Sequence, residues 1–288
     1  MKELNTAVAH AREVDSGERF EFGENWRRFL ELLDEKRIAG AEKSLKDMLG
    51  VEDLRGKRFV DVGSGSGLFS LAARRLGATV HSLDYDPQSV ACTQELRRRY
   101  FPEDADWKVE EGSALDPDYL NSLGKFDVVY SWGVLHHTGS MWEALGNVVP
   151  LVGDRGKLFI AIYNDQGRPS RYWKKVKRWY NKLPKPLRFL VTWPSFVLLW
   201  GRPIVKDVLA GKPTRSFREY GGGRGMSLWR DLVDWVGGYP FEVARPDEIF
   251  AFYRDRGFVL TNMTTRWDLG CNEFVFMKPS EDQRLAWS

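Results

Sequence analysis

Blocks of apolar and polar residues alternate along this chain and predict strands separated by helices. Before residue 164, short apolar runs typical of strands are followed by segments whose apolar residues recur at helical spacing. The expected strands are 58–62, 79–84, 107–111, 126–131 and 156–163. The helices expected between them are 68–76, 87–100, a short one from 117, and 141–148. Strands joined through helices favour a parallel, doubly wound sheet.

Both ends of the chain extend this pattern. Residues 1–19 are polar and are expected to be mobile, whereas 24–33 and 38–49 carry apolar residues at helical spacing and predict an N-terminal helical layer. After the pattern resumes near residue 246, a helix over 246–256 and strands over 258–266 and 272–278 are expected. Because no helix fits between these two strands, the last strand is predicted to be antiparallel.

The strand–helix pattern is interrupted between residues 164 and 245. Six of the twelve tryptophans fall in this stretch, and we expect it to be a largely helical insertion that forms a lid. This interruption divides the chain into four parts. They are an N-terminal helical segment (1–54), a sheet core (55–163 and 246–279), the insertion (164–245) and a C-terminal tail (280–288).

Charge is distributed unevenly. Eleven basic residues and no acidic ones occur from Gln166 to Lys206, and because the whole chain carries +3, the rest of it carries −8. The basic character therefore belongs to the insertion alone. The polar N-terminus without a signal-peptide core and the two cysteines without metal-ligand spacing lead us to expect a cytoplasmic protein.

A glycine-rich segment carries the clearest chemical signal. Residues 59–67 are Phe-Val-Asp-Val-Gly-Ser-Gly-Ser-Gly, so a strand with an acid, Asp61, leads into glycines at alternate positions. The third glycine of a dinucleotide fingerprint would fall at Leu68, and Asp61 would repel a pyrophosphate. A cofactor with a cationic sulfonium and an ammonium would instead be favoured. Asp84 ends the next strand, where a carboxylate can accept hydrogen bonds from both ribose hydroxyls. These residues point to S-adenosylmethionine.

With these residues in place, segments 55–163 and 246–279 resemble the class I S-adenosylmethionine-dependent methyltransferases. The resemblance implies a Rossmann-like, doubly wound α/β fold with a seven-stranded sheet, mostly parallel with an antiparallel last strand. It also implies S-adenosyl-L-methionine as cofactor and S-adenosyl-L-homocysteine as product. In that family these positions hold the methionine part, the ribose and the adenine of the cofactor, and line the methyl-transfer site. The matching residues are Asp61, Gly63, Ser64, Gly65, Gly67, Asp84, Tyr85, Ser113, Ala114, Ser131 and Trp132.

Three residues are candidates for a catalytic base. Histidine accepts protons near neutral pH, so His136 and His137 are the first two. Adjacent residues on a helix point in different directions, so we expect one of the pair to face the acceptor and do not expect a two-histidine metal site. Asp165, at the start of the insertion, is the third candidate.

Five further residues are candidates for holding the acceptor. Tyr163 and Asn164 follow a strand at the same sheet edge as the glycine loop, although the polar run there also favours a simple turn. Asn25 and Trp26 are expected to close over the cofactor, with a core position as the alternative for Trp26. Arg224 lies in a glycine-rich run and is expected either to meet an anionic group of the acceptor or to belong to a linker.

Three interpretations of the basic insertion stay open. Residues 171–182 form an amphipathic helix with one aromatic stripe, which suits a lid that packs on its own domain or walls the acceptor pocket. The same features suit a membrane-surface contact over 171–205, with 189–200 in the interface. Nucleic-acid contact is the third interpretation, and an overall charge near zero makes it the least favoured.

These observations lead to one functional hypothesis. The protein is expected to transfer the sulfonium methyl group, by in-line displacement, to the oxygen or nitrogen of a small-molecule, natural-product or peptide acceptor. The alternatives are a lipid-directed enzyme at the membrane surface, a tRNA or RNA methyltransferase, and a binding protein that holds the cofactor without turnover. Because a sulfonium is already a good leaving group, positioning and exclusion of water would carry most of the catalysis.

Overall fold

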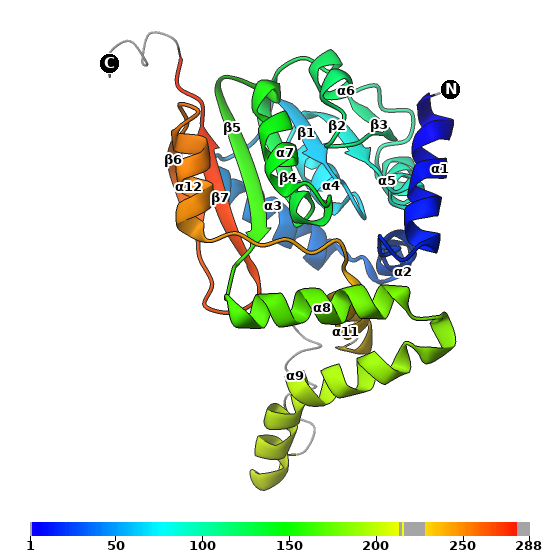
Figure 1. The fold of residues 1–288 in the computed structure, drawn as a ribbon. Coiled ribbons are helices and arrows are strands. Elements are labelled where there is room, and N and C mark those ends of the chain that lie inside the picture. Colours follow the sequence, from blue (N-terminus) through cyan, green and yellow to red (C-terminus); the bar gives the residue numbers. More distant parts are fainter. Residues whose placement is uncertain (1, 213–214, 216–227, 281–288) are drawn as a thin grey trace.

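A twisted sheet forms the centre of this protein (Figure 1). The computed structural model describes residues 2–212, 215 and 228–280. Within them the sheet has seven strands in the order β3-β2-β1-β4-β5-β7-β6, which confirms the predicted fold class. The strands are β1 (Arg58–Val62), β2 (Thr79–Asp84), β3 (Trp107–Glu111), β4 (Phe126–Trp132), β5 (Val152–Tyr163), β6 (Val259–Thr264) and β7 (Cys271–Met277).

Strand direction follows the expected scheme. β1 pairs in parallel with β2 and β4, and β2–β3 and β4–β5 are also parallel. β7 runs antiparallel to both β5 and β6, as predicted for the last strand. β5 begins at Val152, four residues before the expected start, because a register shift after Phe126 lets Val152 pair there. Strand order reverses between β1 and β4, and ligands bind at such switch points in open α/β sheets.

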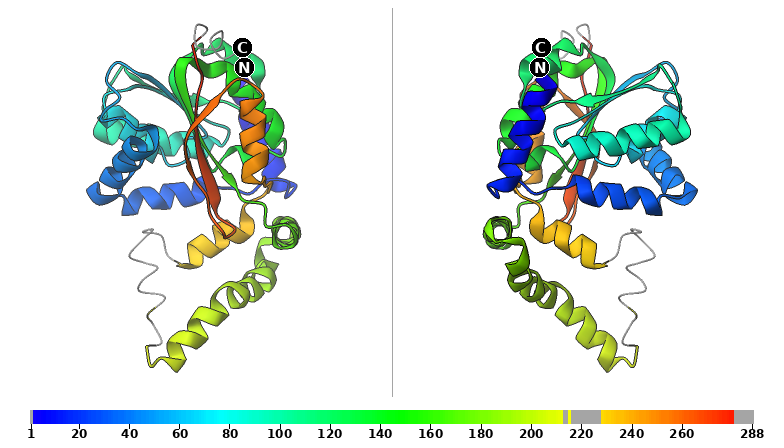
Figure 2. Two further views of the ribbon diagram at one scale, coloured as in Figure 1. Left: turned by 90° about the vertical axis from the view of Figure 1, so that its left-hand side faces the viewer. Right: turned by 90° about the vertical axis from the view of Figure 1, so that its right-hand side faces the viewer.

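Helices cover both faces of the sheet (Figure 2). Alternate strand residues point to opposite faces, so Phe59 and Val128 pack against α3, α4 and α5, whereas Val60 and Val129 pack on the side of α6, α7 and α12. These helices are α3 (Glu35–Leu49), α4 (Leu68–Arg75), α5 (Pro87–Tyr100), α6 (Pro117–Ser122), α7 (Met141–Asn147) and α12 (Pro246–Arg254). Short 3₁₀ turns occur at η1 (Leu135–His137), η2 (Val149–Leu151) and η3 (Lys185–Leu187).

The N-terminal segment differs from the expectation. Residues 1–19 were expected to be mobile, but Lys2–Asp15 forms helix α1, followed by α2 (Gly23–Leu32). The expectation was wrong because polar contacts hold α1 where we looked for an apolar stripe. His10 Nε2 lies 3.9 Å from a carboxylate oxygen of Asp86, and the Tyr85 hydroxyl donates to Glu13 at 3.2 Å.

The insertion forms a separate helical layer beyond one end of the sheet, opposite the chain termini (Figure 1). Its helices are α8 (Arg168–Lys182), α9 (Phe189–Leu209) and α11 (Leu228–Gly237). The two ends of the insertion are held together, because Asn164 and Ala244 form a parallel bridge and the Ala244 amide donates to the Tyr163 carbonyl at 3.0 Å. Among the described helices, none is both long and apolar enough to cross a bilayer.

A buried lysine joins α8 to α11. Lys177 has no solvent exposure, its ammonium donates to the Trp235 carbonyl, and the same group lies 4.1 Å from the Trp235 ring centre and 4.7 Å from that of Phe241. Because a buried charge is costly unless it is paired and hydrogen-bonded, these partners are what makes the position tolerable.

Lys177→Ala should lower the free energy of unfolding by about 2 kcal/mol or more, because it empties buried volume and leaves the Trp235 carbonyl without its donor. Chemical denaturation measures this change. Lys175→Ala is the matched control, since Lys175 is exposed on the same helix and should change stability by less than about 0.5 kcal/mol. Equal effects of the two substitutions would show that Lys177 does not join the helices.

Candidate cofactor and acceptor site

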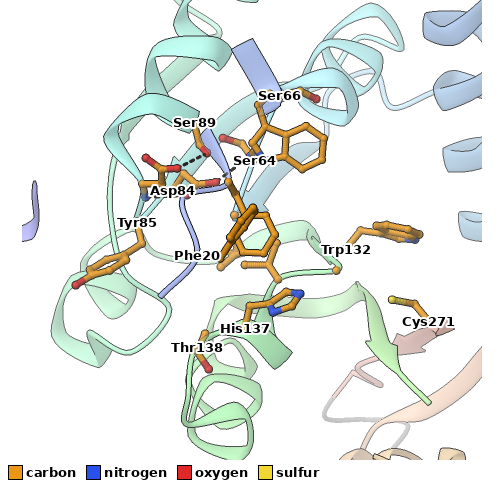
Figure 3. Close-up of a pocket in the computed structure, with 18 of the residues that line it drawn as sticks. Phe20, Ser64, Ser66, Asp84, Tyr85, Ser89, Trp132, His137, Thr138 and Cys271 are labelled. Atoms are coloured by element: carbon orange, nitrogen blue, oxygen red, sulfur yellow. Dashed lines mark hydrogen bonds between the residues drawn. The ribbon is translucent and has the colours of Figure 1, made fainter. Parts of the chain in front are cut away.

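A cavity of about 1160 Å³ opens at the carboxyl ends of β1, β2 and β4. Its wall combines the glycine loop, the turns after β2, β3 and β4, residues of α1 and α2, and part of the insertion. In Figure 3, Asp84, Ser64 and Ser66 lie on one side, and His137, Thr138 and Trp132 on the other, with Phe20 between them. Since ligand pockets are commonly about 300–1,000 Å³, this cavity has room for a cofactor together with an acceptor.

The glycine loop between β1 and α4 needs residues without side chains. Gly63, Gly65 and Gly67 have positive φ values of 86°, 55° and 79°. A Cβ atom on Gly63 would lie 2.3 Å from the side chain of Val134, and one on Gly65 would lie 3.2 Å from the indole of Trp26. The loop therefore passes directly beneath Trp26, which lines the cavity. Gly67 is the N-cap of α4 and is not part of the cavity wall.

Asp84 lies at the end of β2 and holds two backbone amides. One carboxylate oxygen accepts from Gly65 N–H at 2.8 Å and the other from Asp86 N–H at 2.9 Å. Burial raises the pKa of Asp84 to about 6, although both hydrogen bonds act in the opposite direction. Asp86 caps α5 through Gln88 N–H at 2.9 Å, so Asp84 is not needed for that task.

Asp61 is the second carboxylate with a raised pKa in the cavity wall, and it is buried. Its Oδ2 atom accepts from the Ser70 hydroxyl at 2.6 Å, Ser70 accepts from Ser82 at 2.7 Å, and Ser82 accepts from Trp107 Nε1 at 2.9 Å. Burial raises the pKa of Asp61 to about 7, the nearby Asp84 carboxylate adds to the rise, and the bond from Ser70 opposes it. Local sequence patterns could not predict this buried series of hydrogen bonds, because its four members are far apart in the sequence.

These two carboxylates define what the site can bind. Within the described residues, neither Asp61 nor Asp84 is in an ion pair, although Asp61 is buried and Asp84 half-buried beside the same loop. Buried acids with raised pKa values favour a ligand that brings positive charge or hydroxyl donors. S-adenosylmethionine carries a sulfonium, an ammonium and two ribose hydroxyls, so the residues present fit it.

The positions expected to contact adenine also lie in the cavity wall. Ser113 and Ala114 belong to the turn after β3, and Tyr85 follows Asp84 directly. The Tyr85 ring is already contacted, because the Arg19 guanidinium carbon lies 4.8 Å from its centre and the His10 ring meets it edge-on at 5.5 Å. Burial raises the pKa of Tyr85 to about 12, so its hydroxyl is a hydrogen-bond donor at neutral pH.

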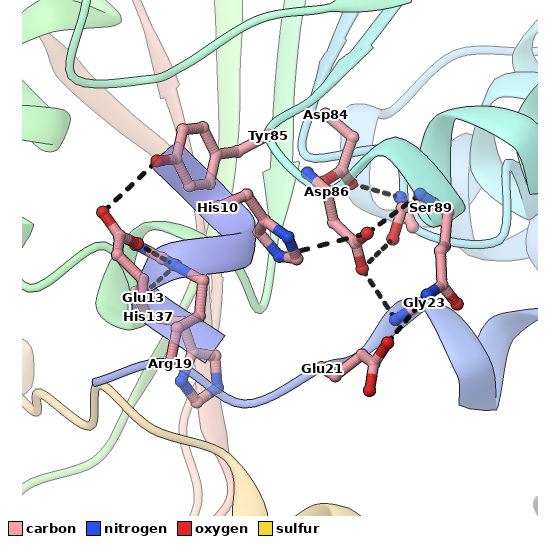
Figure 4. Close-up of polar contacts among 12 residues, drawn as sticks. His10, Glu13, Arg19, Glu21, Gly23, Asp84, Tyr85, Asp86, Ser89 and His137 are labelled. Carbon is pink, nitrogen blue, oxygen red and sulfur yellow. Dashed lines mark hydrogen bonds and ion pairs between the residues drawn. The ribbon is translucent and has the colours of Figure 1, made fainter. Parts of the chain in front are cut away.

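Helix α1 and the segment after it contribute site residues that we did not predict from the sequence. His10, Glu13 and Arg19 line the cavity, and Figure 4 shows them beside Tyr85 and Asp86. Arg19 donates to Glu13 at 2.5 Å and to the backbone carbonyl of His137 at 3.0 Å. It thereby joins the N-terminal segment to the turn after β4, at the far side of the cavity.

The two adjacent histidines have different surroundings. His136 is wholly buried, with its ring centre 4.1 Å from that of Tyr163, whereas His137 lines the cavity. His137 Nδ1 donates to the Pro240 carbonyl at 2.6 Å, which leaves Nε2 as an acceptor. Burial lowers the pKa of His137 to about 3 and that of His136 far below its usual value, so both rings are neutral at physiological pH.

The acceptor side of the cavity is walled by aromatic and apolar residues. Trp132 ends β4 and donates from Nε1 to Glu273 at 3.0 Å, and Tyr163 ends β5. The insertion adds four apolar side chains, and the turn between β6 and β7 adds a polar segment that the sequence analysis did not single out. These lining residues are Leu199, Trp200, Leu232 and Trp235 from the insertion, and Arg266, Asp268, Leu269, Gly270 and Cys271 from the turn.

Besides Gly67 and His136, four sequence candidates lie outside the described cavity wall. Asp165 accepts from Gly167 N–H at 2.7 Å and thus shapes the turn before α8. Asn164 donates to the Arg266 carbonyl at 2.9 Å, and Ser131 donates to the Val62 carbonyl at 2.8 Å. Asn25 is in α2, one residue before Trp26.

Arg224 falls outside the described residues. A metal site was not expected. Among residues that the structure describes, no group of three or more His, Cys, Asp or Glu side chains is arranged to hold a metal ion.

Comparison with known proteins agrees with this geometry. Residues 60–158 match a protein family described as "Methyltransferase domain". A ubiquinone biosynthesis O-methyltransferase of Caulobacter sp. (strain K31) is 29% identical over 141 residues, which are 47% of this chain and 51% of the relative. A tRNA U34 carboxymethyltransferase of Methylococcus capsulatus (strain ATCC 33009 / NCIMB 11132 / Bath) is 29% identical over 154 residues, 51% of this chain and 46% of that protein. The chain thus spans about half the length of these curated relatives.

A solved structure shares the fold. An O-methyltransferase family protein from Burkholderia thailandensis aligns with a TM-score of 0.50 at 14% identity, covering 78% of this chain and 52% of that one. The sheet core is therefore a Rossmann-like, class I S-adenosylmethionine-dependent methyltransferase domain. Its cofactor is S-adenosylmethionine, as the glycine loop and Asp84 predicted.

Cofactor affinity should rise with pH. Below a pKa of about 7 for Asp61 and about 6 for Asp84, the free protein holds protons on these carboxyls, which a cationic ligand must displace. The dissociation constant for S-adenosylmethionine should fall by up to about tenfold per pH unit for each carboxyl, and level off above about pH 8. Calorimetry across this range measures it.

Asp61→Asn is the matched variant for this titration. It keeps an acceptor for Ser70 and removes one titrating group, so its pH profile should be flatter than that of the wild type. A wild-type dissociation constant that stays constant between about pH 5 and about pH 8 would contradict the assignment.

Gly63→Ala should weaken cofactor binding by about tenfold or more, because the new methyl group collides with Val134 and displaces the loop. Gly50→Ala is the matched control: Gly50 has a similar φ of 62° but nothing within 4 Å of an added Cβ. Each substitution should cost about 1–2 kcal/mol of stability through its backbone conformation. Unchanged cofactor binding by folded Gly63→Ala would show that the loop tolerates the shift.

Proposed function

We propose that this protein transfers a methyl group from S-adenosylmethionine to an acceptor bound beneath its helical insertion. One observation carries the proposal: two carboxylates that form no ion pair within the described residues, the buried Asp61 and the half-buried Asp84, share a cavity with an aromatic wall to which the insertion contributes. The methyltransferase match ends at residue 158, so the part of the acceptor wall that the insertion contributes lies beyond the part of the chain that the family shares.

In this proposal, the cofactor half of the cavity has residues that bind each part of S-adenosylmethionine. Asp84 accepts from the ribose hydroxyls, and the glycine loop with Asp61 takes the positively charged methionine part. Tyr85, Ser113 and Ala114 hold the adenine. When bound, S-adenosylmethionine supplies a methyl group on a cationic sulfur, which is activated for attack by a nucleophile.

The acceptor half favours an apolar or aromatic small molecule, or such a group on a larger one. Trp132, Tyr163, Trp200 and Trp235 provide flat apolar surfaces, and Arg266 is the cation among the described lining residues on this side. One relative is named as a ubiquinone biosynthesis O-methyltransferase and another as a tRNA U34 carboxymethyltransferase, so sequence similarity to them does not indicate which class of acceptor this protein uses. The aromatic wall supports a small-molecule acceptor over a nucleic acid.

His137 positions the acceptor in this proposal. Its Nδ1 atom is committed to the Pro240 carbonyl, so Nε2 can accept a hydrogen bond from a hydroxyl or amine that enters the cavity. With a pKa of about 3, the ring stays neutral and orients the nucleophile without removing its proton fully beforehand. The buried surroundings exclude water, and positioning then supplies most of the rate enhancement.

Transfer of labelled methyl from S-adenosylmethionine into fractions of a cell extract tests the proposal. The wild type should label one fraction, and Asp84→Ala should reduce both labelling and cofactor affinity by about tenfold or more, since it removes charge-assisted hydrogen bonds. Asp118→Ala, on an exposed acid of α6, is the matched control and should behave as the wild type.

The fraction that is labelled names the acceptor class, whether organic-soluble, small and aqueous, peptide or RNA. If the wild type binds S-adenosylmethionine but labels no fraction, even with extract from cells that express the protein, the enzymatic proposal fails and a cofactor-binding protein remains. Tight binding of S-adenosylmethionine by folded Asp84→Ala would instead overturn the assignment of the ribose site.

A further inference from the structure

Helix α9 carries large apolar side chains on more than one side. Val191, Phe196 and Leu199 pack partly buried against the core of the insertion, and Thr192, Ser195 and Asp207 are buried, whereas a second set of large apolar side chains faces outward. A globular protein normally buries the apolar side of a surface helix, so this side calls for a partner outside the fold.

The outward side is a continuous stripe. Leu190, Trp193, Val197, Val205 and Val208 follow one another at spacings of three or four residues, apart from one longer step across Gly201, and each is more than half exposed, between 54% and 63%. Leu209 at the end of the helix is 82% exposed. Figures 1 and 2 show α9 as the outermost element of the molecule, at the end opposite the termini.

The α8–α9 part of the insertion, which carries this stripe, is positively charged. Nine exposed basic residues lie on α8, on α9 and between them, and in the part of the chain that the structure describes none is in an ion pair. Asp207, the first acid after the basic run, is buried. The nine residues are Arg168, Arg171, Lys174, Lys175, Arg178, Lys182, Lys185, Arg202 and Lys206.

We propose that α9 docks this protein onto the surface of an anionic lipid bilayer, lying in the interface without crossing it. Aliphatic side chains flanked by lysine and arginine suit an acyl-chain boundary covered by negative headgroups, and Trp193 suits the interfacial layer. A nucleic acid would pair with the basic residues but would leave the aliphatic stripe in water. Pro194 and Pro203 within the helix and its moderate hydrophobicity agree with an interfacial position.

Docking would also place the acceptor cavity at the bilayer. Leu199 and Trp200 of the same helix line the cavity, as do Leu232 and Trp235 of the adjacent α11. A lipid-soluble acceptor would then pass from the interface to the site along α9. This consequence rests on the proposed methyl transfer, whereas docking itself does not.

Flotation with vesicles tests the docking. The wild type should float with vesicles of phosphatidylcholine that contain phosphatidylglycerol, and weakly with phosphatidylcholine alone. High salt should weaken the binding, because it screens the basic residues. The double variant Leu190→Glu/Val197→Glu should bind at least about tenfold more weakly to either vesicle, since it puts charge on the inserted stripe. Leu32→Glu, which alters a 42% exposed leucine of α2, is the matched control and should float as the wild type.

Cofactor binding in the same preparations separates the two proposals. All three proteins should bind S-adenosylmethionine equally, because the altered residues do not line the cavity. Failure of the wild type to float with anionic vesicles, or equal flotation of the double variant, overturns membrane docking whatever the cofactor result. Binding of RNA or self-association through α9 in the absence of vesicle binding would likewise assign the stripe to another partner.

Discussion

The Asp84 carboxylate joins the two turns on which the cofactor site depends. By accepting from Gly65 N–H and Asp86 N–H at once, it connects the glycine loop after β1 to the turn after β2. Asp86 continues the connection, because its other oxygen accepts from Gly23 N–H at 2.7 Å and so fixes the start of α2, which carries Trp26 over the loop. Asp84 and Asp86 together thus position the glycine loop and the helix that carries Trp26, and the two backbone hydrogen bonds to Asp84 favour its charged form against the effect of burial.

The insertion is attached to this site at both ends and is packed from within. Asn164 and Ala244 close its base, and a cluster that includes Trp173, Leu232 and Phe241 forms a third hydrophobic core between the insertion and Phe20. Because Phe20 also lines the cavity, the lid core and the cofactor site share a wall. The acceptor side is therefore shaped by residues outside the shared methyltransferase segment.

Local sequence patterns predicted the sheet, the glycine loop and Asp84, because apolar runs, glycines and strand-end acids act within a few residues of one another. Long-range polar contacts were not predictable in this way. Arg19 reaches the His137 carbonyl across 118 positions, and Asn164 reaches the Arg266 carbonyl across 102. The same limit explains why Asp165 was expected in the site, when its carboxylate is used locally on Gly167. The exposed stripe of α9 was seen as an apolar run, but only the fold shows which side of it faces outward.

The buried chain from Trp107 to Asp61 has a direction. An indole N–H can only donate, so Ser82 accepts the hydrogen bond from Trp107. The Ser82 hydroxyl then donates to Ser70, and the Ser70 hydroxyl donates to Asp61 Oδ2. If either serine reversed, its hydroxyl hydrogen would have no acceptor in this series of hydrogen bonds, whereas the observed direction satisfies every donor. Any proton that Asp61 holds must therefore be on Oδ1, the oxygen that this chain does not use. The buried hydrogen bonds behind the sheet therefore determine that Asp61 gains or loses its proton at Oδ1.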